Sequence, residues 1–401
     1  MAFASRRRRA EVTGRAMRPI GTLFALRDAF EAAAPRLAPR HRYRIAGSRV
    51  GIFTGGGAAT LNLLTAFEPL RVNTTATVED DLSVFVFDGA ALEFDPGALL
   101  SGAAVASEGL TAAQGDGLQA FLQPDIGVLA LYDDTRKRGY IWCRDAATLP
   151  YYEYAAPLKH VLQWWMLAGG GVLLHSAAVG DRTGGVLVAG PSGAGKSSTA
   201  LACIESPLRI AGDDYVAVDC RPPVTVHALY STAKVDRASL GRHPSLAAYF
   251  RNIDRPDEKP MLFVHQFAPD RLLSQFPLQA LVVPNVAGAT RTSFEPMAAA
   301  DALRAIAPSS ILLFPLAGRI AFARIAALCR AFPAYRMNLS PDAGEVADAL
   351  VRSSGARSTG PTRPDAPDCR ADGPRRRALS RRSDRQRACA IARCRRDHRR
   401  R

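Results

Sequence analysis

The sequence predicts an α/β protein with a smaller, mainly β N-terminal domain. Short β-like runs separated by turn residues fill residues 42–149, strands and helices alternate from residue 158 onward, and a glycine-rich loop joins a strand to a helix at 186–201. Short runs bounded by turns are typical of β-rich domains, and alternating strands and helices are typical of α/β layers. We therefore expect an N-terminal domain at 19–150 and a second domain at 151–352.

The N-terminal domain is expected to carry strands at 43–45, 49–53, 82–87 and 139–142, with one or two helices between them. It contains no motif that indicates chemistry. The acidic triplet at 79–81 is interpreted as a solvated loop. The domain is expected either to recognise a partner or to buttress the second domain.

The second domain is expected to begin with a helix at 158–167 and a strand at 172–175, before the strand that leads into the glycine-rich loop. Further strands are predicted at 208–219, 224–229, 261–264, 278–283 and 334–339. Helices are predicted at 298–307, 320–332 and 342–351. The order of these elements favours an α/β layer architecture.

The positive charge of the chain is confined to its two ends. Of the formal net charge of +15, residues 1–18 carry +5 and residues 353–401 carry +11, which leaves −1 for the body between them. A near-neutral body gives no electrostatic reason to expect a specific nucleic-acid partner. Residues 1–18 are interpreted as a basic extension, with Met17 as an alternative start, and residues 353–401 as a disordered Arg-rich tail. Binding of that tail to nucleic acid or an acidic membrane stays open.

Cysteine usage and hydropathy predict a cytoplasmic protein with no membrane span. The most apolar stretch, 161–179, includes Gln163, a run of three glycines and His175, so it is interpreted as a helix followed by a strand. Four cysteines of the body have no metal-ligand spacing and are expected to be reduced thiols. They are Cys143, Cys203, Cys220 and Cys329.

A phosphate-binding loop is predicted between the strand at 186–189 and the helix that follows. The pattern is Gly-x4-Gly-Lys-Ser, in which glycines let backbone N–H groups approach phosphate oxygens and the start of the helix adds partial positive charge. Lys196 is expected on the β- and γ-phosphates of ATP, and Ser197 on Mg²⁺. The cofactor-binding residues are Gly190, Pro191, Ser192, Gly193, Ala194, Gly195, Lys196, Ser197 and Ser198.

Two adjacent carboxylates, Asp213 and Asp214, follow this helix and lie between apolar runs. One carboxylate can hold Mg²⁺, and its neighbour can accept the proton of an attacking hydroxyl. We favour Asp213 as the metal ligand and Asp214 as the base. His175, just ahead of the loop, is a further candidate that would steady phosphate charge or the carboxylate pair.

These three segments together resemble the HPr kinase/phosphorylase superfamily, whose catalytic domain is related in fold to phosphoenolpyruvate carboxykinase. The resemblance rests on the strand with His175, on the loop 190–198 and on the run 212–216, and it covers roughly residues 170–235 with weaker similarity to about 350. It implies a P-loop kinase domain, ATP and Mg²⁺ as cofactors, and catalytic roles for His175, Lys196, Asp213 and Asp214.

The chain departs from that family in two respects. Ser198 stands where those kinases usually have an acidic residue, and their C-terminal glycine-rich signature is missing. The sequence is therefore more similar to the HPr-kinase-like serine kinases, including those of lasso-peptide gene clusters. Lys234 and Lys259 lie in segments that look similar to parts of these proteins, and either could reach a phosphate or an acidic substrate.

The expected function is ATP- and Mg²⁺-dependent transfer of the γ-phosphoryl group to a serine or similar hydroxyl of a protein or peptide. Two alternatives stay open, a nucleotide-binding regulatory module without phosphoryl transfer and a small-molecule kinase. Homo-oligomerisation also stays open, as do the identity of the phosphoryl acceptor and the reversibility of the reaction.

Overall fold

The first sheet of the protein is built from residues 40–143. The computed structural model describes residues 20–38, 40–73, 79–96, 111–242, 244–286 and 288–355. Seven strands pair in the order β1-β2-β3-β7-β6-β5-β4, with β2–β3 and β3–β7 parallel and the other pairs antiparallel. They are β1 (Arg40–Ile45), β2 (Ser48–Thr54), β3 (Leu82–Asp88), β4 (Thr111–Gly115), β5 (Leu118–Gln123), β6 (Val128–Asp133) and β7 (Arg138–Cys143).

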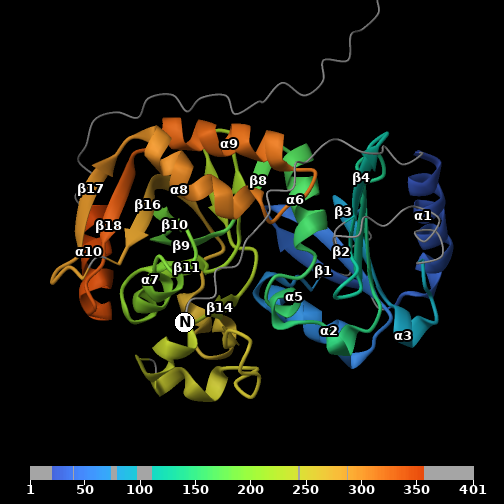
Figure 1. The fold of residues 1–401 in the computed structure, drawn as a ribbon, viewed down its shortest axis with the longest axis horizontal. Coiled ribbons are helices and arrows are strands. Elements are labelled where there is room, and N and C mark those ends of the chain that lie inside the picture. The colour runs from blue at the N-terminus through green and yellow to red at the C-terminus, as the bar shows by residue number, and fades with distance from the viewer. Residues whose placement is uncertain are drawn as a thin grey trace, which may run out of the picture. The chain divides into compact units, whose positions relative to one another are not determined.

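Helices cover both faces of this sheet because its central strands are apolar on both sides. Helix α1 (Ile20–Ala33) places Leu26 and Phe30 against Phe87 and Tyr140 on one face. Alternate residues of the same strands, such as Val84, face the opposite side. That side is covered by helices α2 (Ala58–Leu64), α5 (Tyr151–Ala155) and α6 (Lys159–Ala168), and the short helix α3 (Gly89–Leu92) follows β3 (Figure 1).

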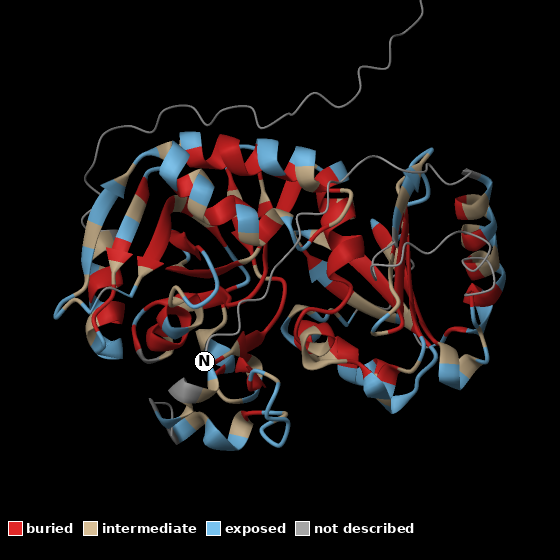
Figure 2. Ribbon diagram, in the orientation of Figure 1, coloured by how far each residue is buried: buried red, intermediate tan, exposed pale blue. Residues whose placement is uncertain are grey.

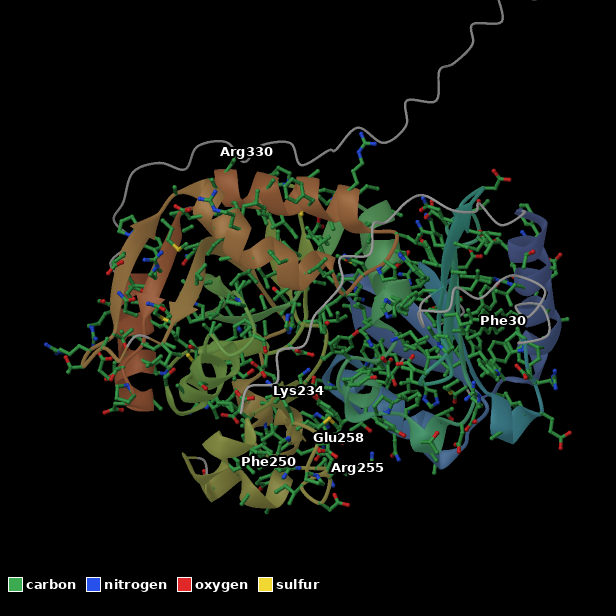
Figure 3. The ribbon with its side chains drawn as sticks, viewed as in Figure 1. Phe30, Lys234, Phe250, Arg255, Glu258 and Arg330 are labelled. Atoms are coloured by element: carbon green, nitrogen blue, oxygen red, sulfur yellow. The ribbon has the colours of Figure 1, made fainter. Side chains whose placement is uncertain are left out.

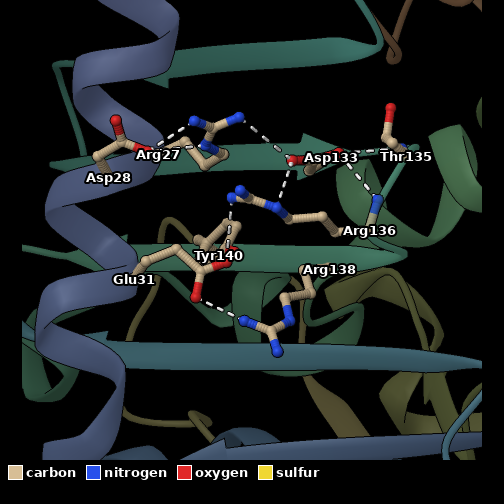
Figure 4. Close-up of polar contacts among 8 residues, drawn as sticks. All are labelled: Arg27, Asp28, Glu31, Asp133, Thr135, Arg136, Arg138 and Tyr140. Atoms are coloured by element: carbon tan, nitrogen blue, oxygen red, sulfur yellow. Dashed lines mark hydrogen bonds and ion pairs between the residues drawn. The ribbon is translucent and has the colours of Figure 1, made fainter.

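In addition to its apolar contacts, helix α1 is held on the sheet by polar contacts (Figure 4). The Glu31 carboxylate accepts hydrogen bonds from the Tyr140 hydroxyl at 2.5 Å and from Arg138 at 2.5 Å. Arg27 lies 3.9 Å from Asp133, whose side chain is nearly fully buried. Helix α1 is therefore held to strands β6 and β7 by charges at the border of its apolar contact.

The second sheet carries the predicted phosphate loop. Seven strands follow the order β11-β9-β10-β16-β13-β12-β8. In addition, β18 pairs with β16 and β17 pairs with β18. The strands are β8 (Gly171–Leu174), β9 (Ser176–Asp181), β10 (Gly184–Ala189), β11 (Arg209–Gly212), β12 (Val216–Asp219), β13 (Thr225–His227), β16 (Gln275–Asn285), β17 (Ser293–Met297) and β18 (Ala334–Asn338). A separate pair is formed by β14 (Thr232–Lys234) and β15 (Met261–Phe263).

Helices again cover both faces of this sheet, so β10 is buried along its whole length and β16 over residues 280–284 (Figure 2). Helices α8 (Ala299–Ile311) and α9 (Gly318–Ala331) cover one face, and α7 (Lys196–Ala202) and α10 (Ala343–Gly355) cover the other. The parallel pairing of β10 with β16, and of β16 with β18, surrounded by antiparallel neighbours, makes a mixed sheet. The predicted α/β class is confirmed.

The two sheets contribute side chains to one hydrophobic core. Val84 of the first sheet and Leu281 of the second belong to the same buried cluster, to which α6 adds Val161 and Leu162. The predicted boundary at residue 150 lies in the turn between β7 and α5. In the part of the chain that the structure describes, no helix has the length and apolar character needed to cross a membrane.

The predicted elements form, with several differences. The stretch 161–179, predicted as a helix followed by a strand, contains α6, β8 and the start of β9. The run 208–219 is two strands, β11 and β12, which pair with different neighbours, and the Asp pair lies in the turn between them. The acidic triplet is not simply a solvated loop, because the Asp80 side chain is 1% exposed and pairs with Arg40 and Arg42. Helix α10 continues to Gly355, past the predicted boundary at 353. Residues 1–19 and 356–401, which include most of both predicted terminal segments, lie outside the described residues.

Arg324 is the buried charge on which the packing of α9 against α6 depends. Its guanidinium donates to the backbone carbonyls of Leu167, near the end of α6, at 2.7 Å and of Gly171, the first residue of β8. We expect Arg324→Met to lower the free energy of unfolding by about 2–4 kcal/mol, because these buried carbonyls would lose their donor. Denaturant titration measures this loss.

The control is Arg330→Met on the same helix, since Arg330 is exposed (Figure 3). Its effect is expected to stay within about 0.5 kcal/mol. Equal losses in the two variants would contradict the role given to Arg324.

Candidate functional site

The loop 190–195 connects β10 to α7, as the sequence predicts. Gly193 has φ +79° and Gly195 has φ +105°, a region that side chains with a Cβ rarely adopt. A Cβ on Gly195 would also lie 2.5 Å from Leu339 Cδ1. Pro191, Ser192 and Gly193 are exposed, so the outer part of the loop is open to a ligand.

Lys196 is the first residue of α7 and is buried. Its Nζ donates to the backbone carbonyls of Gly190 at 3.0 Å and Pro191 at 3.1 Å, which holds the amine over the loop. Burial lowers the pKa of Lys196, and the charges of Asp213 and Asp214 oppose that effect. The amine therefore lies within electrostatic reach of both carboxylates.

Asp213 and Asp214 occupy the turn between β11 and β12, and both are buried. Asp213 Oδ2 accepts a hydrogen bond from the backbone N–H of Lys234 at 3.0 Å. Asp213 Oδ1 is buried and has no hydrogen-bond partner among the described residues. Burial, together with the charge of Asp214, raises the pKa of Asp213 to about 6, and the Ser197 hydroxyl is close enough to oppose the rise.

Asp214 is surrounded by cationic and hydrogen-bonding groups instead. Its Oδ2 lies 2.7 Å from Lys234 Nζ, and its Oδ1 lies 3.1 Å from His175 Nε2. Burial favours the neutral acid, but the Lys234 charge and the contacts from His175 outweigh it and lower the pKa of Asp214 below its usual value. Burial also disfavours the charged form of Lys234, yet Asp214 raises the pKa of that amine. This pair is ionised at neutral pH.

His175 lies between β8 and β9, where the chain passes from one strand to the next. Its ring packs on Tyr215 at a centroid distance of 5.2 Å, and its backbone N–H donates to Ser310 Oγ at 3.1 Å. The second ring nitrogen, Nδ1, is buried without a hydrogen-bond partner among the described residues. The histidine is thus fixed against Asp214 by its neighbours on both sides.

The structure brings His175, Lys196, Asp213 and Asp214 together at the end of the second sheet, and Ser197 lies beside Asp213. Ser198 is exposed on α7. Lys259, which the sequence offered as a phosphate or substrate ligand, pairs with Asp236 at 2.7 Å.

Lys234 is the site residue whose position the sequence did not predict. It was considered as a ligand for phosphate or substrate, whereas its side chain contacts Asp214 and its backbone contacts Asp213. Figure 3 labels it on the segment that includes β14. The only signal in the sequence is indirect: two adjacent buried carboxylates require a nearby cation.

The donor set around Asp213 fits Mg²⁺. A carboxylate oxygen without a partner beside a serine hydroxyl offers the oxygen ligands that this ion prefers, and Mg²⁺ usually takes one or two protein ligands and completes its shell with water and phosphate. Among the described residues, no group of three or more His, Cys, Asp or Glu side chains is placed to hold a metal. These residues therefore do not form a metal site in which side chains alone fill the coordination shell.

No family model matches the chain, and no curated protein matches it. Among solved structures, the chain is similar to the HPr(Ser) kinase/phosphatase of Coxiella burnetii, with 14% identity and a TM-score of 0.27, over 47% of this chain and 99% of that chain. This weak similarity is to a kinase-like enzyme. A TM-score this low does not establish a shared fold, and the residues of the site are the evidence for a function.

The raised pKa of Asp213 has a consequence for stability. Between the ordinary value of 3.8 and about 6, the folded protein holds a proton on Asp213 that the unfolded chain releases, so the contribution of this group to stability falls as pH rises through that window. We expect Asp213→Asn, which does not titrate, to be more stable than the wild type above pH 6, by up to about 3 kcal/mol. Below about pH 4 the difference disappears.

Thermal unfolding of the metal-free protein between pH 4 and pH 8 measures this difference. Asp254→Asn, at an exposed position, is the matched control and is expected to track the wild type. A variant at Asp213 that is less stable than the wild type at pH 8 would contradict the burial of an uncompensated charge.

Proposed function

We propose that the chain is a P-loop kinase of the HPr kinase type that uses ATP and Mg²⁺ to phosphorylate a serine or similar hydroxyl of a protein or peptide. The observation that supports this best is the difference between the two adjacent carboxylates. Asp213 Oδ1, beside Ser197, has no hydrogen-bond partner among the described residues, and Asp214 is held ionised by Lys234 and His175. Phosphoryl transfer needs both, a metal ligand and a group that orients the acceptor.

The loop and its lysine would hold the nucleotide. Backbone N–H groups of residues 190–198 would face the phosphate oxygens, and Lys196 would exchange its contacts with the loop carbonyls for contacts with the β- and γ-phosphates. Asp213 and Ser197 would hold Mg²⁺, which neutralises charge on the transferred group when bound.

Asp214 would orient the acceptor hydroxyl and take its proton as the phosphoryl group leaves ATP. The lowered pKa of Asp214 makes it a weak base, but the transition state of this reaction is loose and depends more on position than on base strength. His175 and Lys234 would keep the carboxylate in place and ionised, and His175 would add a donor near the γ-phosphate.

Transfer of radiolabel from [γ-³²P]ATP to proteins and peptides encoded beside this gene tests the proposal, with mass spectrometry to locate the modified residue. We expect the wild type to label a serine or similar hydroxyl. Asp214→Asn keeps the size and hydrogen bonding of the side chain but loses its charge, so ATP should still bind while transfer falls by about 10²-fold or more. Asp254→Asn is the control that should transfer at the wild-type rate.

Each other outcome points to a different function. Equal transfer by the wild type and Asp214→Asn would refute the base. ATP binding without labelling of any acceptor would favour a nucleotide-dependent regulatory module. Labelling of a small molecule alone would favour a small-molecule kinase.

A further inference from the structure

A cavity of about 500 Å³ lies apart from the loop and the Asp pair. Its walls include residues from the segments 66–70, 228–231 and 265–274, together with Arg209 of β11 and Arg182 of the turn between β9 and β10. None of the residues 190–198 lines it. Its volume is within the range of roughly 300–1,000 Å³ that is usual for small-molecule sites.

The two arginines lie at the end of the second sheet that is remote from the loop. Strands β9 and β10 form a hairpin in which Ser176 pairs with Ala189 at one end and Asp181 with Gly184 at the other. Arg182 is in the turn after Asp181, and Arg209 pairs with Gly180. At the usual rise of a strand, about 3.3 Å per residue, Arg182 is roughly 20 Å from His175.

Neither guanidinium pairs with an acidic side chain in the part of the chain that the structure describes. Arg182 is exposed and Arg209 is half-buried, and the side chain of neither makes a hydrogen bond or an ion pair with a described residue. The acidic residue of the lining, Glu68, is exposed and pairs with Arg71 at 3.3 Å. The cavity therefore carries two cations that are available to a ligand.

The rest of the lining is apolar with a polar pair at one wall. Leu229 and Leu273 are buried, and Leu70 is half-buried. Ser231 Oγ lies 2.8 Å from His265 Nδ1, and the other ring nitrogen of His265 is left for a further partner. An apolar interior with a few convergent polar groups is the usual composition of a small-molecule site.

We propose that this cavity binds a small organic anion, with an apolar body against the leucines and a phosphate or carboxylate group on Arg182 and Arg209. Arginine recognises both anions through paired N–H donors.

The cavity is joined to the candidate active site by a short, firmly held segment. Ser231 begins this segment and Lys234 ends it. Ser231 N–H donates to the Ala66 carbonyl at 2.9 Å, and Lys234 contacts both Asp213 and Asp214. A ligand that contacts Ser231 and His265 is therefore expected to reduce the local opening of the strand that positions Lys234. Only the effect of this coupling on phosphoryl transfer rests on the proposed function.

Calorimetry of the full chain with phenyl phosphate and with phenylacetate, against neutral benzyl alcohol, tests the binding. We expect at least one of the two anions to bind at least tenfold more tightly than benzyl alcohol, and Arg182→Gln/Arg209→Gln to weaken it tenfold or more. Binding of phosphate alone or of carboxylate alone supports the proposal and assigns the anionic group. The matched control is Arg319→Gln/Arg330→Gln, two exposed arginines of α9, which should leave the affinity unchanged.

Two further measurements separate this site from the loop and from misfolding. Arg182→Lys/Arg209→Lys keeps the charge and should retain measurable binding. Hydrogen exchange of the 228–236 backbone should slow at least twofold when the anion binds, in the wild type and not in the glutamine variant. Both readouts are independent of any kinase activity.

The proposal is overturned if neither anion binds, or if the glutamine variant binds the anion as tightly as the wild type. Anion binding that depends on Lys196 but not on the two arginines would place the ligand in the phosphate loop and overturn it as well.

Discussion

Two adjacent carboxylates are buried at one turn of the second sheet, and compensation of their charge is the constraint on which the site depends. Two negative charges side by side in an apolar setting cannot both ionise without a cation nearby. Lys234 and His175 contact Asp214 and keep it charged, whereas Asp213 accepts the backbone N–H of Lys234 and retains a raised pKa because burial outweighs that bond and the effect of Ser197. The two carboxylates of the site therefore differ: Asp214 is ionised by its contacts, and the charge of Asp213 is not compensated by a cation in contact with it.

The first sheet and its helices contribute to this arrangement through β14. The Thr232 hydroxyl donates to the Ala155 carbonyl at 2.7 Å, and Ser231 N–H donates to the Ala66 carbonyl at 2.9 Å. These bonds fix the strand that ends at Lys234, so residues far from the loop set the position of the cation next to Asp214. Of the two roles expected for the N-terminal part, buttressing of the second part is the one that these contacts support.

The sequence predicts the local features of this site and misses the long-range ones. The loop 190–198 is recognisable because its glycines and its place between strand and helix are local properties, and the Asp pair is recognisable because apolar runs flank it. The contact of Lys234 with Asp214 joins residues 20 positions apart through tertiary packing. The same holds for Asp80, which lies in the loop before β3 and pairs with Arg40 and Arg42 of β1. Helix α1 escaped prediction, although its apolar residues at 23, 26 and 30 have helical spacing.

Under the proposed function, Asp213 binds the metal ion of the nucleotide, and the proton that Asp213 releases on binding tests this role most directly. Calorimetry of Mg·ATP binding in buffers of different ionisation enthalpy gives the number of protons released on binding. Subtracting the value for Asp213→Asn removes the protons that come from the nucleotide itself. We predict a difference of about half a proton between wild type and variant at pH 6, falling toward zero by pH 8, because a metal ion displaces the proton of its carboxylate ligand. Equal proton release by both proteins at pH 6, or ATP binding that is indifferent to Mg²⁺, would contradict the account.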